Sequence, residues 1–149
     1  MKILSVCNIK SSIYLDAIAI RHKVFVEEQQ VSPEIEIDKN EALCIHFVLY
    51  NDENTAIATA RLLPDSEKEN FATLQRMAVL KEFRGKGYGR DVIVEIETFA
   101  KLNNISEIVL HAQLSAKNFY TKMRYISFGD EFEEAHIKHI CMKKVIFLI

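Results

Sequence analysis

The chain has 149 residues, of which 49% are hydrophobic and 27% are charged, a composition typical of a folded globular protein. This length fits one domain, so we expect residues 1–149 to form a single domain with a buried core. The net charge of −2 excludes a general attraction to nucleic acid or to an anionic membrane. Any basic site must therefore be local.

The cysteines and the chain ends carry no signal for export. Three cysteines lie far apart and form no CxxC pair, so neither a disulfide framework nor a zinc site is predicted, which favours the cytoplasm. The first residues lack the continuous apolar core of a signal peptide. The C-terminal segment VIFLI is too short to span a membrane and is expected to be the end of a buried strand.

The first half of the chain predicts a strand, a helix, a loop and a hairpin. Residues 2–8 alternate as a strand does, and apolar residues then recur at helical spacing from Ser11 or Ser12 to about Val24. Residues 31–42 contain Pro33 and four acids, which predicts a loop. Residues 44–50 and 55–63 flank the turn-forming NDEN and predict an antiparallel hairpin.

The second half alternates strands and helices. A strand is expected over 71–79, and beyond Gly89 a helix is expected to end near Asn103. Residues 105–113 predict another strand, and residues 115–123 predict a short helix that Ser115 would cap. Residues 125–132 and 136–149 are expected to complete the sheet.

Three of the four glycines fall in the stretch EFRGKGYGRD, at positions 85, 87 and 89. A glycine loop between a strand and a helix exposes backbone N–H groups at the positive end of the helix, which suits phosphate. Arg84, Lys86 and Arg90 add positive charge to the same stretch. A tight turn with solvated basic residues is the simpler alternative. The spacing GxGxG fits neither a P-loop nor a dinucleotide-binding loop.

The segment RGKGYG resembles the [QR]xxGx[GA] acyl-CoA signature of the GNAT superfamily of N-acetyltransferases, and it lies between the expected strand and helix. The resemblance extends over nearly the whole chain: RHKVFVEEQ, TARLLP, QRMAV, RGKGYG and FYTKM occur in the order typical of the ElaA/YjcF-like branch. It implies an α/β (α+β) GNAT fold, a mixed and mostly antiparallel sheet flanked by helices. It also implies direct transfer of acetyl from acetyl-CoA, as co-substrate, to a primary amine in a ternary complex, without a metal.

The resemblance implies that the loop amides bind the pyrophosphate of coenzyme A and that the preceding strand binds the pantetheine arm. One strand N–H would polarise the thioester carbonyl. The implied cofactor-binding residues are Met77, Ala78, Val79, Arg84, Gly85, Lys86, Gly87, Tyr88, Gly89, Arg90 and Asn118.

Acyl transfer to an amine needs a base for the ammonium and an acid for the departing thiolate. By resemblance Tyr120 is the acid, although its ring could simply pack beside Phe119. Glu28 and His111 are candidate bases, with a surface carboxylate, a hydrogen-bonded strand histidine and a water chain as the alternatives. Arg61 and Arg76, each within an apolar strand, are expected either to line the acceptor pocket and hold a carboxylate or to be solvated.

Other charged side chains remain open to two interpretations. The acids Glu34, Glu36 and Asp38 either attract a cationic acceptor or belong to a solvated loop. His136 and His139 would point to opposite faces of one strand, which disfavours a metal site.

The chain departs from the family at Arg124, where the helix after FYTKM normally ends on glycine. Either the turn is reshaped or Arg124 has a local task, which leaves the placing of Tyr120 open. A non-catalytic acyl-CoA sensor or interaction module and an acyl-homoserine-lactone synthase are the alternative functions. Pairing of the edge CMKKVIFLI is expected to allow a homodimer.

Overall fold

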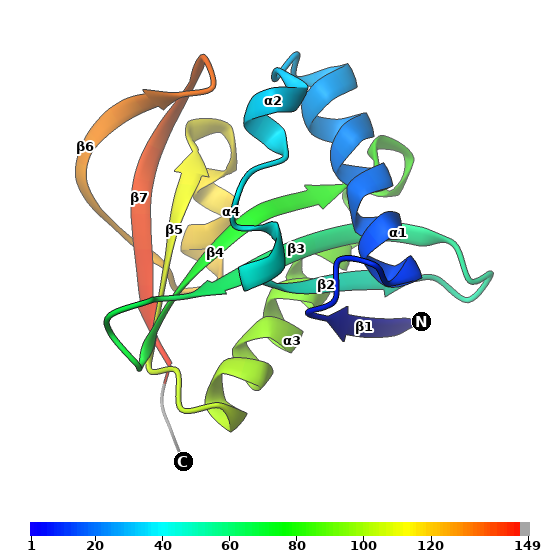
Figure 1. The fold of residues 1–149 in the computed structure, drawn as a ribbon. Helices are drawn as coiled ribbons and strands as arrows, with labels where there is room; N and C mark the ends of the chain where they lie inside the picture. The colour runs from blue at the N-terminus through cyan, green and yellow to red at the C-terminus, as the bar shows by residue number, and fades with distance from the viewer. Residues whose placement is uncertain (147–149) are drawn as a thin grey trace.

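A computed structural model describes residues 1–146 (Figure 1). Its strands are β1 (Lys2–Val6), β2 (Ile45–Tyr50), β3 (Ala56–Pro64), β4 (Phe71–Val79), β5 (Glu107–Gln113), β6 (Ile126–Glu134) and β7 (Ile137–Val145). Its α-helices are α1 (Ser12–Arg21), α2 (Pro33–Glu36), α3 (Tyr88–Leu102) and α4 (Lys117–Lys122). A π-helical segment (His22–Glu28) extends α1, and 3₁₀ turns occur at Glu41–Leu43, Lys81–Phe83 and Leu114–Ala116.

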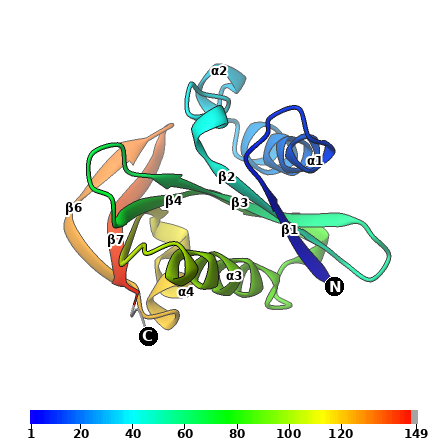
Figure 2. The ribbon, with the colours of Figure 1, turned by 60° about the horizontal axis from the view of Figure 1, so that its bottom comes forward.

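The described strands form one seven-stranded sheet in the order β1-β2-β3-β4-β5-β7-β6. Every neighbouring pair is antiparallel except β4 and β5, which are parallel. Figure 2 shows α1 and α2 on one face of the sheet and α3 and α4 on the other. This is the mixed, mostly antiparallel sheet flanked by helices that the sequence predicts.

The helices cover the sheet because their apolar residues recur on one side. On α3, Val92, Ile93, Ile96 and Ala100 are fully buried, in the spacing of a single helical face. They join the larger core cluster with β2, β3 and β5. Ala17 and its neighbours on α1 form a second cluster on the opposite face, against Val48 and Ala78.

The sheet splits between its two parallel strands. Pairing of β4 with β5 covers four residue pairs and ends at Leu74 and Leu110. Just beyond, β4 contains a bulge, because between the pairs Thr59–Ala78 and Arg61–Gln75 one residue of β3 opposes two of β4. Arg76 lies in this bulge with φ 57°, a left-handed conformation that is rare for arginine. The backbone of Met77–Val79 is therefore not paired with β5.

Two expectations about local structure are wrong. Ser115 does not cap α4, because it lies within the preceding 3₁₀ turn and the residue before the helix is Ala116. β7 cannot offer a free edge for a dimer, because it pairs with β5 on one side and β6 on the other. The strand predicted to end in VIFLI ends at Val145, and residues 147–149 lie outside the described part of the chain.

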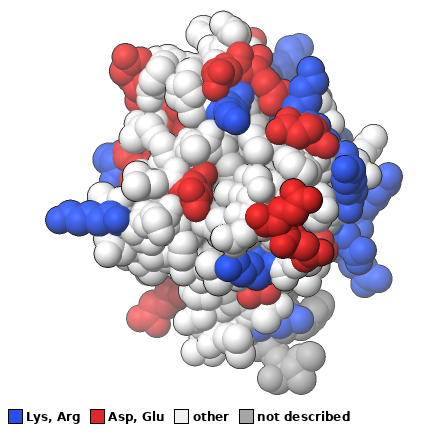
Figure 3. Space-filling model, turned by 90° about the vertical axis from the view of Figure 1, so that its right-hand side faces the viewer, with Lys and Arg blue, Asp and Glu red and all other residues white. Residues whose placement is uncertain are grey.

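The outer surface carries charges of both signs. Figure 3 shows acidic and basic side chains distributed over the face that lies at the right of Figure 1. Among residues 1–146, no helix has the length and apolar character needed to cross a membrane.

Candidate active site

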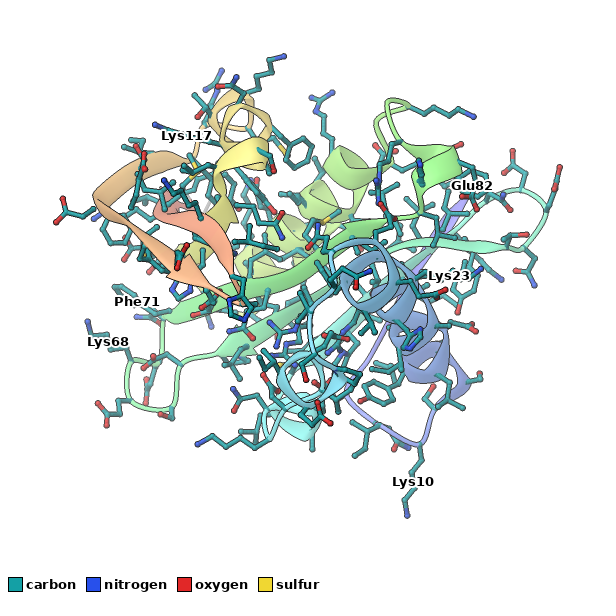
Figure 4. The ribbon with its side chains drawn as sticks, turned by 90° about the horizontal axis from the view of Figure 1, so that it is seen from above. Lys10, Lys23, Lys68, Phe71, Glu82 and Lys117 are labelled. Atoms are coloured by element: carbon teal, nitrogen blue, oxygen red, sulfur yellow. The ribbon has the colours of Figure 1, made fainter. Side chains whose placement is uncertain are left out.

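A cavity of about 1000 Å³ opens where β4 and β5 separate. Figure 4 looks down into the molecule, with β6 and β7 on one side, α1 on the other and β4 crossing between them. Several predicted site residues line the cavity together: Arg76, Met77, Ala78, Val79, Arg84, Gly85, Gly87, Tyr88, Gly89, Arg90, His111 and Tyr120. Four others, Glu28, Arg61, Lys86 and Asn118, are not among its lining residues.

The glycine loop forms one end of the cavity. Gly85 and Gly87 have φ values of 77° and 85°, and a Cβ on either would contact no protein atom within 4 Å. Gly89 differs from them, since a Cβ there would lie 3.3 Å from the end of the Met77 side chain, a tight contact. The loop therefore bends with its backbone unobstructed while α3 begins in close contact with β4.

Arg84 and Glu28 connect this loop to the end of the π-helical segment. The Arg84 guanidinium donates to both Glu28 carboxylate oxygens at 2.7 and 3.0 Å, and its Nε donates to the Val79 carbonyl. Both carboxylate oxygens of Glu28 are thus occupied by Arg84, and Glu28 is not among the cavity-lining residues. The geometry therefore disfavours Glu28 as a base and makes it a support for the loop.

Tyr120 meets the cavity from the α3 side of the sheet. Only 7% of the residue is exposed, and its ring makes edge contacts with Phe119 and Tyr125. Burial raises the pKa of Tyr120, so its phenol stays protonated at neutral pH. The ring packs beside Phe119, as one interpretation of the sequence expects, and it also lines the cavity. The role of Tyr120 as the acid stays a prediction.

Arg124 keeps the backbone geometry of the glycine that it replaces. Its φ is 72°, its N–H donates to the Thr121 carbonyl at 2.9 Å, and the Tyr125 N–H donates to the Tyr120 carbonyl at 3.0 Å. These two bonds define a Schellman motif at the end of α4. The turn is therefore not reshaped, and the placing of Tyr120 does not suffer from the substitution.

Replacing Arg124 by glycine is expected to raise the free energy of unfolding by about 0.5–1 kcal/mol, because glycine adopts this conformation without steric cost. The gain is reduced by the extra freedom of glycine in the unfolded chain. Urea denaturation measures the change. Lys122→Gly, within the last turn of the same helix, should instead lower stability by about 1 kcal/mol. A destabilised Arg124→Gly variant would show that the arginine side chain has a local task.

A network of buried ion pairs lies behind the opposite wall of the cavity. It joins α1 and the segment 33–43 to β3 and β4. Its members are three arginines and three carboxylates, so its charges balance: Arg21, Arg61, Arg76, Glu36, Asp38 and Glu41.

Arg21 holds the centre of this network. It is 1% exposed, and its guanidinium donates to both oxygens of Glu36 and of Glu41 at 2.7 to 3.0 Å. Burial by itself would raise the pKa of Glu41, but the hydrogen bonds and charge of Arg21 outweigh it and lower that pKa to about 2. The carboxylate therefore stays ionised inside the protein.

The network corrects two predictions. Segment 31–42 contains the helix α2 and is not a solvated acidic loop, because Glu36 is buried and paired with Arg21 and Arg76. Arg61 does not line the cavity; its guanidinium is occupied by Asp38, Glu41 and Gln75. Arg76 does line the cavity, while its Nε and Nη2 bind the segment 35–38.

Two further groups of polar side chains lie at the cavity and were missed in the sequence. Gln29 and Gln113 exchange amide hydrogen bonds across it. Glu134 contacts His111 and His139. The alternation of side chains along β5 and β7 could have suggested that His111 and His139 lie on the same face of the sheet. No local sequence pattern marks Glu134. His136 is not on a strand, since it lies in the turn after β6 with φ 66°.

A split sheet, an unobstructed glycine loop at a helix start and a buried tyrosine around one cavity fit the acyltransferase class. The family model of the acetyltransferase (GNAT) domain matches residues 10–146. The uncharacterized N-acetyltransferase YjcF of Bacillus subtilis is 35% identical over 130 residues, covering 87% of this chain and 90% of YjcF. The chain therefore belongs to the GNAT acetyltransferase family.

Solved structures agree on the fold. A protein of Lactobacillus plantarum superposes with a TM-score of 0.89 at 27% identity, covering 98% of both chains. Escherichia coli ElaA superposes with a TM-score of 0.82 at 24% identity, covering 97% of this chain and 99% of ElaA. The resemblance to the ElaA/YjcF-like branch is confirmed.

Proposed function

We propose that residues 1–149 form one catalytic domain that transfers acetyl from acetyl-CoA to a primary amine of a small molecule or peptide, directly within a ternary complex. The observation that carries this proposal is the shared cavity: the glycine loop, the unpaired part of β4 and Tyr120 all face it. We expect the protein to act in the cytoplasm, where its three free cysteines remain reduced.

The cofactor fits the residues that line the cavity. Backbone N–H groups of the Gly85–Gly89 loop lie at the start of the 15-residue helix α3, where the helix dipole favours the pyrophosphate. Arg90 adds positive charge from the first turn of that helix. The pantetheine arm would lie alongside Met77–Val79 of β4, where β4 is no longer paired with β5.

The transfer needs two proton movements. The acceptor ammonium loses a proton, its nitrogen attacks the thioester carbonyl carbon, and the C–S bond breaks as the new C–N bond forms. Tyr120 would give its phenolic proton to the departing thiolate and recover a proton from the nitrogen, which loses a second proton as it becomes the amide. A backbone N–H of β4 would stabilise the oxyanion, a contribution of about 2.7–4 kcal/mol in enzymes where such a donor was removed.

The lining of the cavity supports a position for the acceptor. Loop and α3 residues occupy one end, so the acceptor enters from the end between the β6–β7 hairpin and α2, which Figure 1 shows at the same end of the molecule. The two acids of segment 33–38 that line the cavity, Glu36 and Asp38, are paired with arginines, and Glu34 is not among the lining residues. Recognition of the amine must therefore come from other groups.

Calorimetric titration with acetyl-CoA tests this function. Gly87→Glu places bulk and negative charge in the loop and is expected to weaken binding at least about tenfold. Gly129→Glu is a matched control, since Gly129 also has positive φ, 73°, and a Cβ there would also meet no protein atom within 4 Å, but it lies on β6. The control should bind as the native protein does.

A native protein that binds no acetyl-CoA would overturn the proposed function. If both glutamate variants lose binding equally, the loss is caused by backbone strain and not by the position of Gly87 in the loop. If binding is normal, thiol release is then measured with spermidine, glucosamine and Nα-acetyl-lysine as amine acceptors.

A further inference from the structure

We propose that Glu134 and His111 form a carboxylate–imidazole pair in which Glu134 positions His111 to take the proton from the acceptor ammonium. This inference rests on the proposed function and assigns a positioning residue to it. His111 Nδ1 lies 3.2 Å from Glu134 Oε1. Both residues line the cavity, although they belong to different strands, β5 and β6.

His111 is placed where the sheet opens. Pairing of β5 with β4 ends at Leu110, so His111 is the first β5 residue beyond the split. On the other side of the split, β4 continues to Met77–Val79. The thioester of acetyl-CoA would lie along these three residues. About 43% of the His111 side chain is exposed, which gives a proton taken from the ammonium a route to solvent.

The contact with Glu134 selects the useful form of the imidazole. A carboxylate next to Nδ1 favours a proton on that nitrogen, since an ionised carboxylate can only accept a hydrogen bond. The lone pair of Nε2 is then available for the ammonium proton. After the transfer, Glu134 Oε1 still accepts the hydrogen bond from Nδ1–H, as the carboxylate does in other carboxylate–histidine pairs.

The surroundings hold this pair in place. Phe132 packs edge-on against His111 at 5.2 Å and stacks on His139 at 5.7 Å between ring centroids. The second Glu134 oxygen lies 3.8 Å from His139 Nε2, and His139 is buried. Glu134 directly precedes the two-residue turn at 135–136, where both residues have positive φ, so the hairpin geometry determines its direction.

Charge in the cavity distinguishes Glu134 from the other carboxylates. Three carboxylates line the cavity, and two of them, Glu36 and Asp38, are paired with arginines. Among residues 1–146, Glu134 has ion-pair contacts with histidines alone. Of the cavity-lining carboxylates, Glu134 is therefore the one whose negative charge no arginine in the described part of the chain neutralises. That charge can interact with an imidazolium or with an incoming ammonium.

The test uses steady-state thiol release with the best acceptor among spermidine, glucosamine and Nα-acetyl-lysine. Glu134→Gln is expected to lower kcat at least about tenfold, because a glutamine amide can donate to Nδ1 and favour the wrong tautomer. The KM for acetyl-CoA should stay within about twofold, since the pair lies away from the loop. Glu133→Gln is the matched control, because Glu133 is its exposed neighbour on β6 and is not among the lining residues.

A pairwise test separates positioning from general loss of structure. His111→Ala should lower kcat at least as much as Glu134→Gln, and imidazole added to the buffer should restore part of its turnover. The double variant should be no slower than His111→Ala, because residues that act as a unit are not additive. Native-like kcat in Glu134→Gln, or additive losses in the double variant, would overturn the pair. Absence of amine-dependent turnover in the native protein would instead overturn the proposed function itself, and the pair with it.

Discussion

Replacing Tyr120 by phenylalanine is expected to lower kcat by about 100-fold while acetyl-CoA binds as before. The substitution removes the hydroxyl that would protonate the departing thiolate and leaves the ring against Phe119 and Tyr125. Because burial raises the pKa of Tyr120, the native phenol remains a proton donor across the neutral range. Steady-state thiol release, with binding measured by calorimetry, checks both parts of this expectation.

Tyr125 supplies the control for Tyr120. Tyr125 is 2% exposed, and its ring contacts the ring of Tyr120. Its hydroxyl donates to Glu97 at 2.9 Å, and it is not among the cavity-lining residues. Tyr125→Phe should lower stability by about 1 kcal/mol, since it removes one hydrogen bond to Glu97 while Glu97 keeps its ion pair with Lys144, and should leave kcat unchanged.

The result for Tyr120 also separates two functions. A slow Tyr120→Phe variant that binds acetyl-CoA normally would exclude the alternative of a non-catalytic acyl-CoA sensor. Native kcat in Tyr120→Phe would show that another group or a water protonates the thiolate. The proposed role of Tyr120 would then be withdrawn, although the proposed acetyl transfer would stand.

Replacing Arg21 by methionine is expected to lower the free energy of unfolding by about 3–5 kcal/mol. Methionine fills a similar volume but leaves the buried network with two arginines and three carboxylates, so one negative charge in the interior loses its partner. Urea denaturation at neutral pH measures the loss, because at that pH Glu41 is fully ionised in the native state.

A second substitution distinguishes charge imbalance from poor packing. Arg21→Met combined with Glu36→Gln restores the charge balance and should recover part of the lost stability, whereas a packing defect would persist. Arg90→Met removes an exposed arginine and should change stability by no more than about 0.5 kcal/mol. An Arg21→Met variant that is as stable as the native protein would contradict the buried network.

Most residues predicted to bind the cofactor line the cavity together, whereas Arg61 and Glu28, predicted for the acceptor end, do not. The glycines, their basic neighbours and Tyr120 lie in two short continuous segments, so their spacing could be matched to a family pattern directly. Arg61 and Glu28 were placed less well, because each is held by a partner at least 20 residues away. A helical signal did exist for one member of the network, since Arg21 lies on the same face as Tyr14 and Ala17.

The sequence by itself determined the order of the strands and of helices α1, α3 and α4, the glycine loop and the family, because these depend on residues that are close together in the chain. Tertiary structure alone decided which charges meet. It brought Glu36 and Glu41 into contact with Arg21. It also brought Glu134 of β6 to His111 of β5, 23 residues apart, because both strands pair with β7. The physical reason is that an ion pair depends on distance in space, which the pairing of the sheet sets and which local spacing does not record.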